Sequence, residues 1–276
     1  MPPEGFGLAE VAALFRAACQ AELGAFKPGN VHVFRGGHGM TVATFEKAAE
    51  VAAVRLVAGR SVGERIEGAV KASLAAVGCN ANLGIILLCA PLAEAALSLG
   101  PDEELRPALA RTLSRLTVAD AEAAYRAIAA ANPGGLGSAP DQDVADAPTV
   151  TLRAAMSQAA HRDRIALQYV TDFEDVFASA AAYDARPPGR AAVEDVYLGL
   201  LSLFPDSHVA RKFGAETAET LRREAAAFAA SLDAEPDRDR ALDAFDLHLK
   251  ARGLNPGTTA DLTVAAVFTA LLQRNR

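Results

Sequence analysis

The sequence contains no tryptophan, few other aromatic residues and only three cysteines. Aromatic residues make up 6% of the 276 positions, whereas hydrophobic residues make up 51%. The core must therefore consist mainly of Ala, Leu and Val, which favours closely packed helices over a sheet sandwich. Cys19, Cys79 and Cys89 show neither a CxxC nor a zinc-type spacing, so we interpret them as small hydrophobic residues in a reducing environment.

An excess of positive charge is also absent. The net charge of −7 argues against nucleic acid as a partner, because a phosphate backbone requires a basic face. The N-terminus lacks the basic start of a signal peptide. The most apolar run, 83–100, is interrupted by Pro91 and Glu94 before it reaches the roughly 20 residues of a membrane span. We expect a cytoplasmic protein with no membrane segment.

The common nucleotide and hydrolase motifs are missing. The sequence contains no GxxxxGK[ST], no GxGxxG after a strand, no HExxH and no GxSxG. Any nucleotide chemistry must therefore use a different set of residues.

Helical periodicity covers most of the chain, and no convincing strand pattern or internal repeat is present. We predict a single all-α domain, 1–276, with about ten to twelve helices. Ser61 with Glu64, and Thr117 with Asp120, match the capping box that begins a helix. The expected helices are 8–23, 42–58, 62–77, 83–99, 102–116, 118–131, 150–170, 173–184, 191–203, 208–232, 237–252 and 259–273.

Three turns between these helices contain Pro-Gly, at 27–30, 132–135 and 255–258. Proline fixes one backbone angle and glycine permits a positive one, so each turn can expose N–H groups. Beside a helix start such groups attract anions. Ordinary helix connections would look the same, but three polar turns favour a shared phosphate-binding mouth, with Lys27 facing solvent.

The expected helix 150–170 carries a polar stripe, because polar residues recur there at spacings of three and four. A solvated outer face would give the same pattern. The preceding loop, 132–149, adds carboxylates, and carboxylates near guanidinium groups suit Mg²⁺ and a polyphosphate. The stripe consists of Arg153, Ser157, His161, Arg164 and Gln168, and the loop carboxylates are Asp141, Asp143 and Asp146.

Two further segments combine helix-start signals with charge. In 204–214, Asp206 or Ser207 can cap a helix whose first turns carry Arg211 and Lys212. In 255–262, Thr258 and Asp261 match a capping box, so a purely structural role for Asp261 is as plausible as a functional one.

Six motifs in order make this chain similar to the triphosphoribosyl-dephospho-CoA synthase family over about 10–272. They are KPGNVH with GHGM, GCNANLGIILLCAPLA, ANPGGLG, LRAAMSQAAHRDRIALQY, DSHVARKFG and NPGTTADL. The resemblance implies an all-helical enzyme that uses ATP, with Mg²⁺, and dephospho-CoA. An acceptor ribose hydroxyl attacks C1′ of the ATP ribose, and adenine departs while the triphosphate stays on the ribose.

The resemblance also implies roles for particular residues. Glu22, Asp143 and Asp163 would hold Mg²⁺ or stabilise an oxocarbenium-like transition state. The oligomeric state stays open, with a homodimer among the alternatives. The residues expected to contact phosphates or nucleotide are Lys27, Gly29, Asn30, His38, Asn80, Asn82, Arg162, Arg164, Gln168, Ser207, Arg211 and Lys212.

The chain departs from the family pattern at several positions. His32 and Gly39 stand where carboxylates are typical, and the segment 80–84 reads NANLG in place of NTHKG. The segments KPGNVH, AAHRDRIALQY and DSHVARK resemble more closely a divergent branch from archaea and C1-metabolising bacteria. Two alternatives therefore accompany the synthase prediction: an enzyme of tetrahydromethanopterin or methanofuran-type cofactor biosynthesis with a different phosphorylated acceptor, and a non-catalytic helical ligand-binding protein.

Overall fold

The computed structural model describes residues 5–37, 39–100, 102–132, 146–232 and 234–276. Within these ranges the chain forms fourteen helices and no strand, which confirms the all-α prediction and exceeds the predicted ten to twelve helices. The helices are α1 (Leu8–Leu23), α2 (Val42–Ala58), α3 (Val62–Val77), α4 (Leu83–Leu97), α5 (Leu105–Ser114), α6 (Val118–Ala131), α7 (Leu152–Ala159), α8 (Arg164–Val170), α9 (Glu174–Asp184), α10 (Arg190–Leu203), α11 (Ser207–Phe213), α12 (Ala215–Leu232), α13 (Arg238–Ala251) and α14 (Gly257–Arg274).

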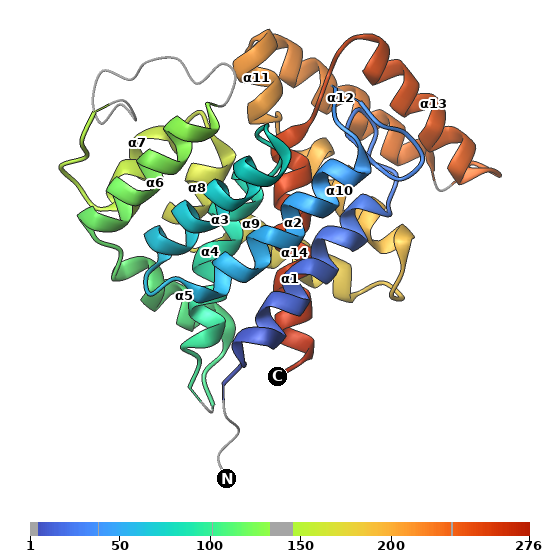
Figure 1. The fold of residues 1–276 in the computed structure, drawn as a ribbon. Helices are drawn as coiled ribbons and strands as arrows, with labels where there is room; N and C mark the ends of the chain where they lie inside the picture. The colour runs from blue at the N-terminus through green and yellow to red at the C-terminus, as the bar shows by residue number, and fades with distance from the viewer. Residues whose placement is uncertain (1–4, 38, 101, 133–145, 233) are drawn as a thin grey trace.

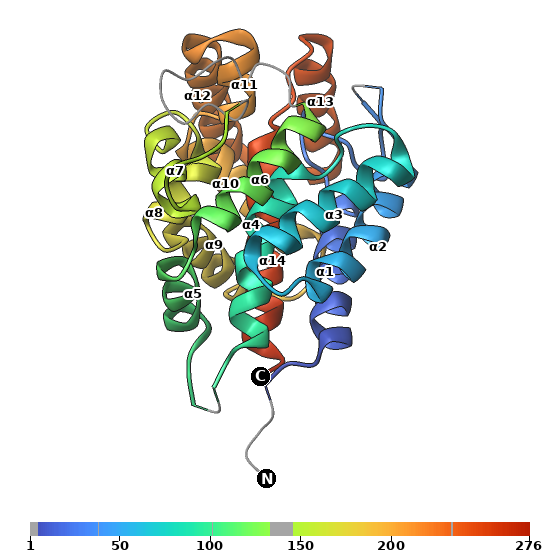
Figure 2. The same ribbon diagram turned by 60° about the vertical axis from the view of Figure 1, so that its left-hand side comes forward.

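Helix α14 runs through the middle of the bundle (Figures 1 and 2). It begins at the end of the molecule where α11, α12 and α13 lie, and it ends near the start of α1. Thirteen of its eighteen residues are buried, as are twelve of the fifteen residues of α4. A helix that is apolar on nearly all sides must lie inside the protein. The apolar run 83–100 is therefore a core helix, and none of the described helices is long and apolar enough to cross a membrane.

Side chains of the core fall into two clusters. The larger one surrounds α4 and α14 and reaches α1, α2, α3, α6 and α9. The smaller one joins α10, α11, α12 and α13 and includes Phe26 from the loop after α1. Glycine allows close helix contact in the larger cluster, since a Cβ at Gly63 would lie 2.6 Å from Cα of Asp120. Asp120 also accepts a hydrogen bond from the Gly63 N–H (2.8 Å), which ties α3 to α6.

The helix predicted over 150–170 is two helices, so the prediction of one polar stripe is wrong. Asp163 has extended backbone angles and accepts a hydrogen bond from the Ala166 N–H (3.0 Å), which makes it the N-cap of α8. Aspartate competes well for such positions because its short side chain reaches the free N–H groups. Arg153 consequently lies on α7, where it pairs with Asp172 (2.7 Å) and donates a hydrogen bond to the Val170 carbonyl at the end of α8 (3.3 Å).

The helix predicted over 208–232 is also divided. Gly214 has φ of +93°, a conformation that a glycine adopts without strain, and it separates α11 from α12. The break leaves Arg211 and Lys212 in the last turn of a short helix.

Candidate active site

Two long buried helices, α4 and α14, begin next to each other. Asp261 of α14 packs against Gly84 of α4, where an added Cβ would overlap the Asp261 carboxylate and lie 2.8 Å from Cδ1 of Ile165. Any larger residue at position 84 would require the side chains of Asp261 and Ile165 to move. Helix starts carry free N–H groups and the positive end of the helix dipole. An anion placed between α4 and α14 would be attracted by both.

The shorter helices α8 and α11 are joined to these starts by hydrogen bonds. Asp206, the N-cap residue of α11, accepts hydrogen bonds from the N–H (2.7 Å) and the hydroxyl (2.8 Å) of Thr259 in α14. It also accepts a hydrogen bond from the Val209 N–H (3.0 Å). The Ser207 hydroxyl accepts a hydrogen bond from the Arg164 N–H (2.9 Å). The first residues of α8, α11 and α14 therefore form one connected polar layer.

The predicted capping box between Thr258 and Asp261 is wrong. Pro256 is the N-cap residue of α14 and makes no side-chain cap. The Thr258 hydroxyl accepts a hydrogen bond from the His208 N–H (3.2 Å), and the capping carboxylate comes from Asp206 on another helix. The side chain of Asp261 is thus left for another role.

Two of the three Pro-Gly turns pack against each other beside these helix starts. Gly29 has φ of +86°, and a Cβ there would lie 2.8 Å from Cδ of Pro256. The Asn30 amide donates a hydrogen bond to Oδ1 of Asn255 (2.8 Å). The turns at 27–30 and 255–258 therefore form one wall of the site, while most of the turn at 132–135 lies outside the described residues.

Lys27 is buried within this wall, contrary to the prediction that it faces solvent. Its side chain is 1% exposed and forms an ion pair with Glu22 across the turn. Its Nζ also donates a hydrogen bond to Oδ1 of Asn30 (3.2 Å). Burial raises the pKa of Glu22 and lowers the pKa of Lys27, and the attraction within the pair opposes both shifts. A lysine can be buried here because the carboxylate of Glu22 is buried beside it and compensates its charge.

The N–H groups of the first turn are used within the protein. The Gly29 N–H donates a hydrogen bond to Asp246 of α13 (2.9 Å), and the Asn30 N–H donates one to the Lys27 carbonyl (2.8 Å). His32 is fully buried and also contacts Asp246, with Nε2 3.4 Å from Oδ1. Asp246 thus holds the loop after α1 against α13. Because the backbone N–H groups of the turn are occupied, only its side chains are available to a ligand.

Arg211 brings a positive charge to the start of α8. Its NH1 lies 2.5 Å from Oδ2 of Asp163. The Arg211 guanidinium can donate a further hydrogen bond, because its Nε is buried and has no acceptor among the described residues.

The start of α4 carries a second donor of this kind. Asn82, the N-cap residue of α4, is 6% exposed, and its Nδ2 meets no acceptor in the described part of the chain. The neighbouring Asn80 instead accepts a hydrogen bond from the Leu83 N–H (3.2 Å). A buried polar group without a partner costs about 1–3 kcal/mol, so such a group is expected where a ligand or a water completes its hydrogen bonding.

A sequence profile of the ATP:dephospho-CoA triphosphoribosyl transferase family matches residues 8–276 of this chain. The chain belongs to this family. A solved structure from Archaeoglobus fulgidus, provisionally described as a triphosphoribosyl-dephospho-CoA synthase, shares 26% sequence identity and has a TM-score of 0.66. The similarity covers 85% of this chain and all of the archaeal chain. Comparison with curated proteins gives no match.

Several residues predicted to bind nucleotide have other contacts. The Arg164 guanidinium binds Asp175 through two hydrogen bonds (2.8 and 2.9 Å) and stacks on Phe204 at 3.3 Å. Gln168 is fully buried and donates a hydrogen bond to the same carboxylate (2.5 Å). These residues join α8 to α9 and α10. Exposed residues of the predicted set are Arg162 and Lys212, whose contact with nucleotide stays a prediction.

Two of the three predicted Mg²⁺ ligands have cationic partners in the described part of the chain. Glu22 pairs with Lys27 and Asp163 pairs with Arg211. In the described ranges, no three His, Cys, Asp or Glu side chains are grouped to hold a metal ion. Asp143 and the predicted phosphate contact His38 lie outside these ranges. A role for these residues in binding Mg²⁺ therefore stays a prediction.

The largest difference from the predicted site is Asp261. The sequence offered one signal, the position of this carboxylate four residues after a Pro-Gly turn, but the same signal fits a cap. The contact with Gly84 shows that Asp261 of α14 lies against the start of α4, close to Ile165 of α8. Glycine at the second position of an otherwise apolar helix was the second available signal.

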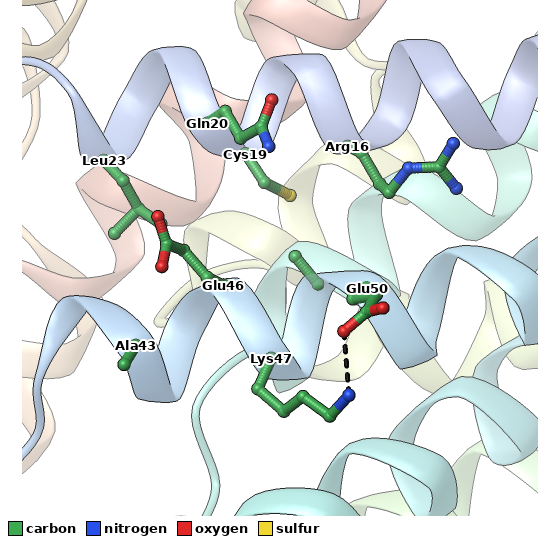
Figure 3. Close-up of a pocket in the computed structure, with 9 residues that line it drawn as sticks. Arg16, Cys19, Gln20, Leu23, Ala43, Glu46, Lys47 and Glu50 are labelled. Atoms are coloured by element: carbon green, nitrogen blue, oxygen red, sulfur yellow. Dashed lines mark hydrogen bonds and ion pairs between the residues drawn. The ribbon is translucent and has the colours of Figure 1, made fainter.

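A groove of about 690 Å³ lies between α1 and α2 (Figure 3). Its floor includes Cys19 and Leu23, and its rim carries two cations and two carboxylates. Lys47 and Glu50 of the rim pair with each other at 2.8 Å. The positive and negative charges of this groove are equal in number, so it has no preference for a polyanion. No residue from the starts of α4, α8, α11 or α14 lines it. The rim charges are Arg16, Glu46, Lys47 and Glu50.

Proposed function

We propose that this protein transfers a triphosphoribosyl group from ATP to dephospho-CoA and releases adenine. The observation that carries the proposal is the meeting of the starts of α4 and α14 beside two buried donors, Asn82 Nδ2 and Arg211 Nε, that have no acceptor in the described chain. Membership of the ATP:dephospho-CoA triphosphoribosyl transferase family supplies the chemical identity of the two substrates.

The triphosphate would lie at the paired helix starts. The helix dipoles favour phosphate oxygens there, and Arg211 adds a full positive charge. Phosphates held in this way fix the position of the ribose, and positioning is a large part of catalysis for a transfer between two bound molecules. The layer made by Asp206, Ser207 and Thr259 joins the start of α14 to the starts of α8 and α11.

The chemical step is a substitution at C1′ of the ATP ribose. The bond from C1′ to N9 of adenine breaks with its electron pair on adenine, while a hydroxyl oxygen of the acceptor ribose bonds to C1′. The transition state carries positive charge on the sugar, as in glycoside hydrolysis. Any Mg²⁺ would arrive with ATP, bound by its phosphates, because the described side chains do not make a three-ligand site for it.

The experiment is incubation with ATP, Mg²⁺ and dephospho-CoA, followed by mass spectrometry and chromatography of the free base. Free adenine with the matching mass gain on dephospho-CoA supports the proposal. CoA, which carries an additional phosphate on its adenosine ribose, is the comparison acceptor. Release of AMP or inorganic phosphate in place of adenine would identify a different transfer.

The other functions predicted from the sequence are outcomes of the same experiment. ATP that stabilises the protein without reacting with dephospho-CoA would direct the search to a C1-cofactor precursor as acceptor. A protein that binds neither ATP nor triphosphate would be a non-catalytic member of the family. A homodimer stays a prediction, to be tested by the molar mass in solution.

Asn82→Ala tests the observation on which the proposal depends. The change removes a buried donor without a partner, so the free protein should keep or gain stability, while ATP affinity should fall about 10–100-fold for the loss of a hydrogen bond to a charged group. Thermal unfolding and calorimetric titration with ATP measure the two effects. Asn80→Ala is the matched control, and it should lower stability by about 1 kcal/mol because Asn80 caps the first turn of α4. Unchanged ATP affinity in Asn82→Ala would remove Asn82 from the site.

A further inference from the structure

Asp261 differs from the other acidic residues of the site because its carboxylate accepts no hydrogen bond from any described residue. Glu22 accepts one from Lys27, and Asp163 accepts hydrogen bonds from Arg211 and a backbone N–H. Asp206 accepts two from Thr259 and one from a backbone N–H. Across the described ranges, no donor forms a hydrogen bond with the Asp261 carboxylate, although its side chain is partly buried.

Hydrogen bonds from N–H and O–H groups stabilise the charged form of a carboxylate, so their absence favours the neutral acid. The surroundings act in the same direction. Helix α4 contributes Gly84, and α8 contributes the apolar Ile165. The Ile165 side chain, which lies against the same point of α4, has no group that could donate a hydrogen bond.

The charged groups that act on Asp261 come from α1, from the turn after it, and from the segments around the starts of α8 and α11. Burial raises the pKa of the Asp261 carboxyl well above its ordinary value, and the charges of Asp206, Glu22 and Asp163 raise it further. Arg211 opposes this effect, and Lys27 is attracted to the same carboxylate. The carboxylates of α1, α8 and α11 thus act together against ionisation of Asp261.

We propose that Asp261 is the general acid that protonates adenine as it leaves the ATP ribose. The inference rests on the proposed function. As the bond between C1′ and N9 breaks, its electron pair moves onto adenine and the Asp261 proton moves to a ring nitrogen. The acceptor hydroxyl releases its proton to solvent, and Asp261 regains one from solvent, so no net proton is gained or lost.

The place of Asp261 suits this role. It is in α14, whose start attracts the triphosphate, so it lies on the same side of the bundle as the bound ATP. The negative charge of a bound triphosphate would further disfavour ionisation of a nearby carboxyl. Binding of ATP therefore keeps Asp261 in the protonated form that the leaving base needs. A general acid of this kind contributes about 10²–10⁴-fold to the rate.

The test compares wild type and Asp261→Asn with three donors, ATP, 7-deaza-ATP and 3-deaza-ATP. Each deaza analogue lacks one ring nitrogen that could accept the proton. With ATP, kcat should fall about 10²–10⁴-fold in Asp261→Asn, while the affinity for ATP, measured by calorimetry, should change less than threefold. With the analogue that lacks the accepting nitrogen, wild type should be slow and Asp261→Asn should be slowed no further. Asp102→Asn, at an exposed carboxylate outside the site, is the control.

The outcomes separate the two proposals. Wild type that releases no adenine from ATP would refute the proposed function, whatever the variant does. Wild type that releases adenine, with Asp261→Asn equally fast, would refute the role of Asp261 alone. Equal losses in Asp261→Asn with all three donors would show that Asp261 acts by positioning and not by proton transfer. Thermal unfolding of both proteins verifies that each is folded under the assay conditions.

Discussion

At the scale of single residues, the acidic groups of the site differ in the partners that they have. Glu22 has Lys27 and Asp163 has Arg211, whereas Asp261 has no donor among the described residues. Removing one partner of a buried pair leaves the other charge without compensation. Each of these groups can therefore be tested through stability as well as through activity.

Lys27→Met removes the cation and leaves Glu22 buried. The free energy of unfolding should fall by roughly 3–5 kcal/mol, the usual effect of breaking a buried pair from one side. Urea denaturation at pH 7 measures this change. The double variant Glu22→Gln/Lys27→Met should regain most of the loss because it removes both charges. Lys47→Met, at a residue with a 55% exposed side chain, is the control and should change stability by less than about 1 kcal/mol. A stable Lys27→Met protein would contradict the burial of this pair.

The pH dependence of stability provides a second test of Asp261. Its pKa in the folded protein is raised above the value in the unfolded chain, so the folded state retains a proton that the unfolded state has released. Stability from this group is therefore fully present below the unfolded pKa and is lost as the pH rises towards the folded pKa. Asn at position 261 does not ionise, so the variant does not show this loss of stability.

The difference in unfolding free energy between Asp261→Asn and wild type should consequently grow in favour of the variant from pH 4 upward. Glu22 and Asp206 are present in both proteins, so the difference measures the ionisation of Asp261 together with its coupling to these two groups. Denaturation curves at several pH values measure it. A difference that stays constant with pH would mean that Asp261 is ionised with an ordinary pKa in the folded protein.

At the scale of helices, local sequence determined most of the boundaries. Thr117 with Asp120 forms the predicted capping box, and Ser61 caps α3 as expected. The two divided helices could not be predicted from periodicity, because each break depends on a specific local competitor. Asp163 gains both a cap and an ion pair with Arg211, which lies 48 residues away. The contact between Gly84 and Asp261 could likewise not be predicted, since it joins two helices that are distant in sequence.

Gly84→Ala tests the contact between the starts of α4 and α14. The new methyl group would overlap the Asp261 carboxylate and crowd Ile165, so the variant should lose about 1–3 kcal/mol of stability and most of its activity. Thermal unfolding and the adenine-release assay measure these effects.

Gly199→Ala is the matched control for this change. Gly199 lies inside α10, where an added Cβ meets no atom within 4 Å. Alanine should therefore raise stability by roughly 0.5–1 kcal/mol. If Gly84→Ala behaved like Gly199→Ala, the close approach of α4 and α14 would be wrong.

At the scale of the whole molecule, the site is assembled from five separated parts of the chain. The sequence identified each part as polar and placed several near helix starts, so the resemblance to a family could be stated from motifs. What it could not give was which groups satisfy one another. Lys27 is charged and follows a helix, which normally predicts exposure, but Glu22, Asn30 and the last quarter of the chain bury it. Burial of this kind depends on tertiary contacts and not on local pattern.

The fastening of the first turn to the end of the chain also has a consequence for biosynthesis. Gly29 depends on Asp246 and on Pro256, and Asn30 depends on Asn255, so more than two hundred residues are translated before the turn finds its contacts. Pairings so distant in sequence form late in folding, after the entropy of closing a long loop has been overcome. A nascent chain released before α14 therefore has neither the central helix nor the finished turn. The wall formed by the two turns can therefore assemble only after the start of α14 has been translated.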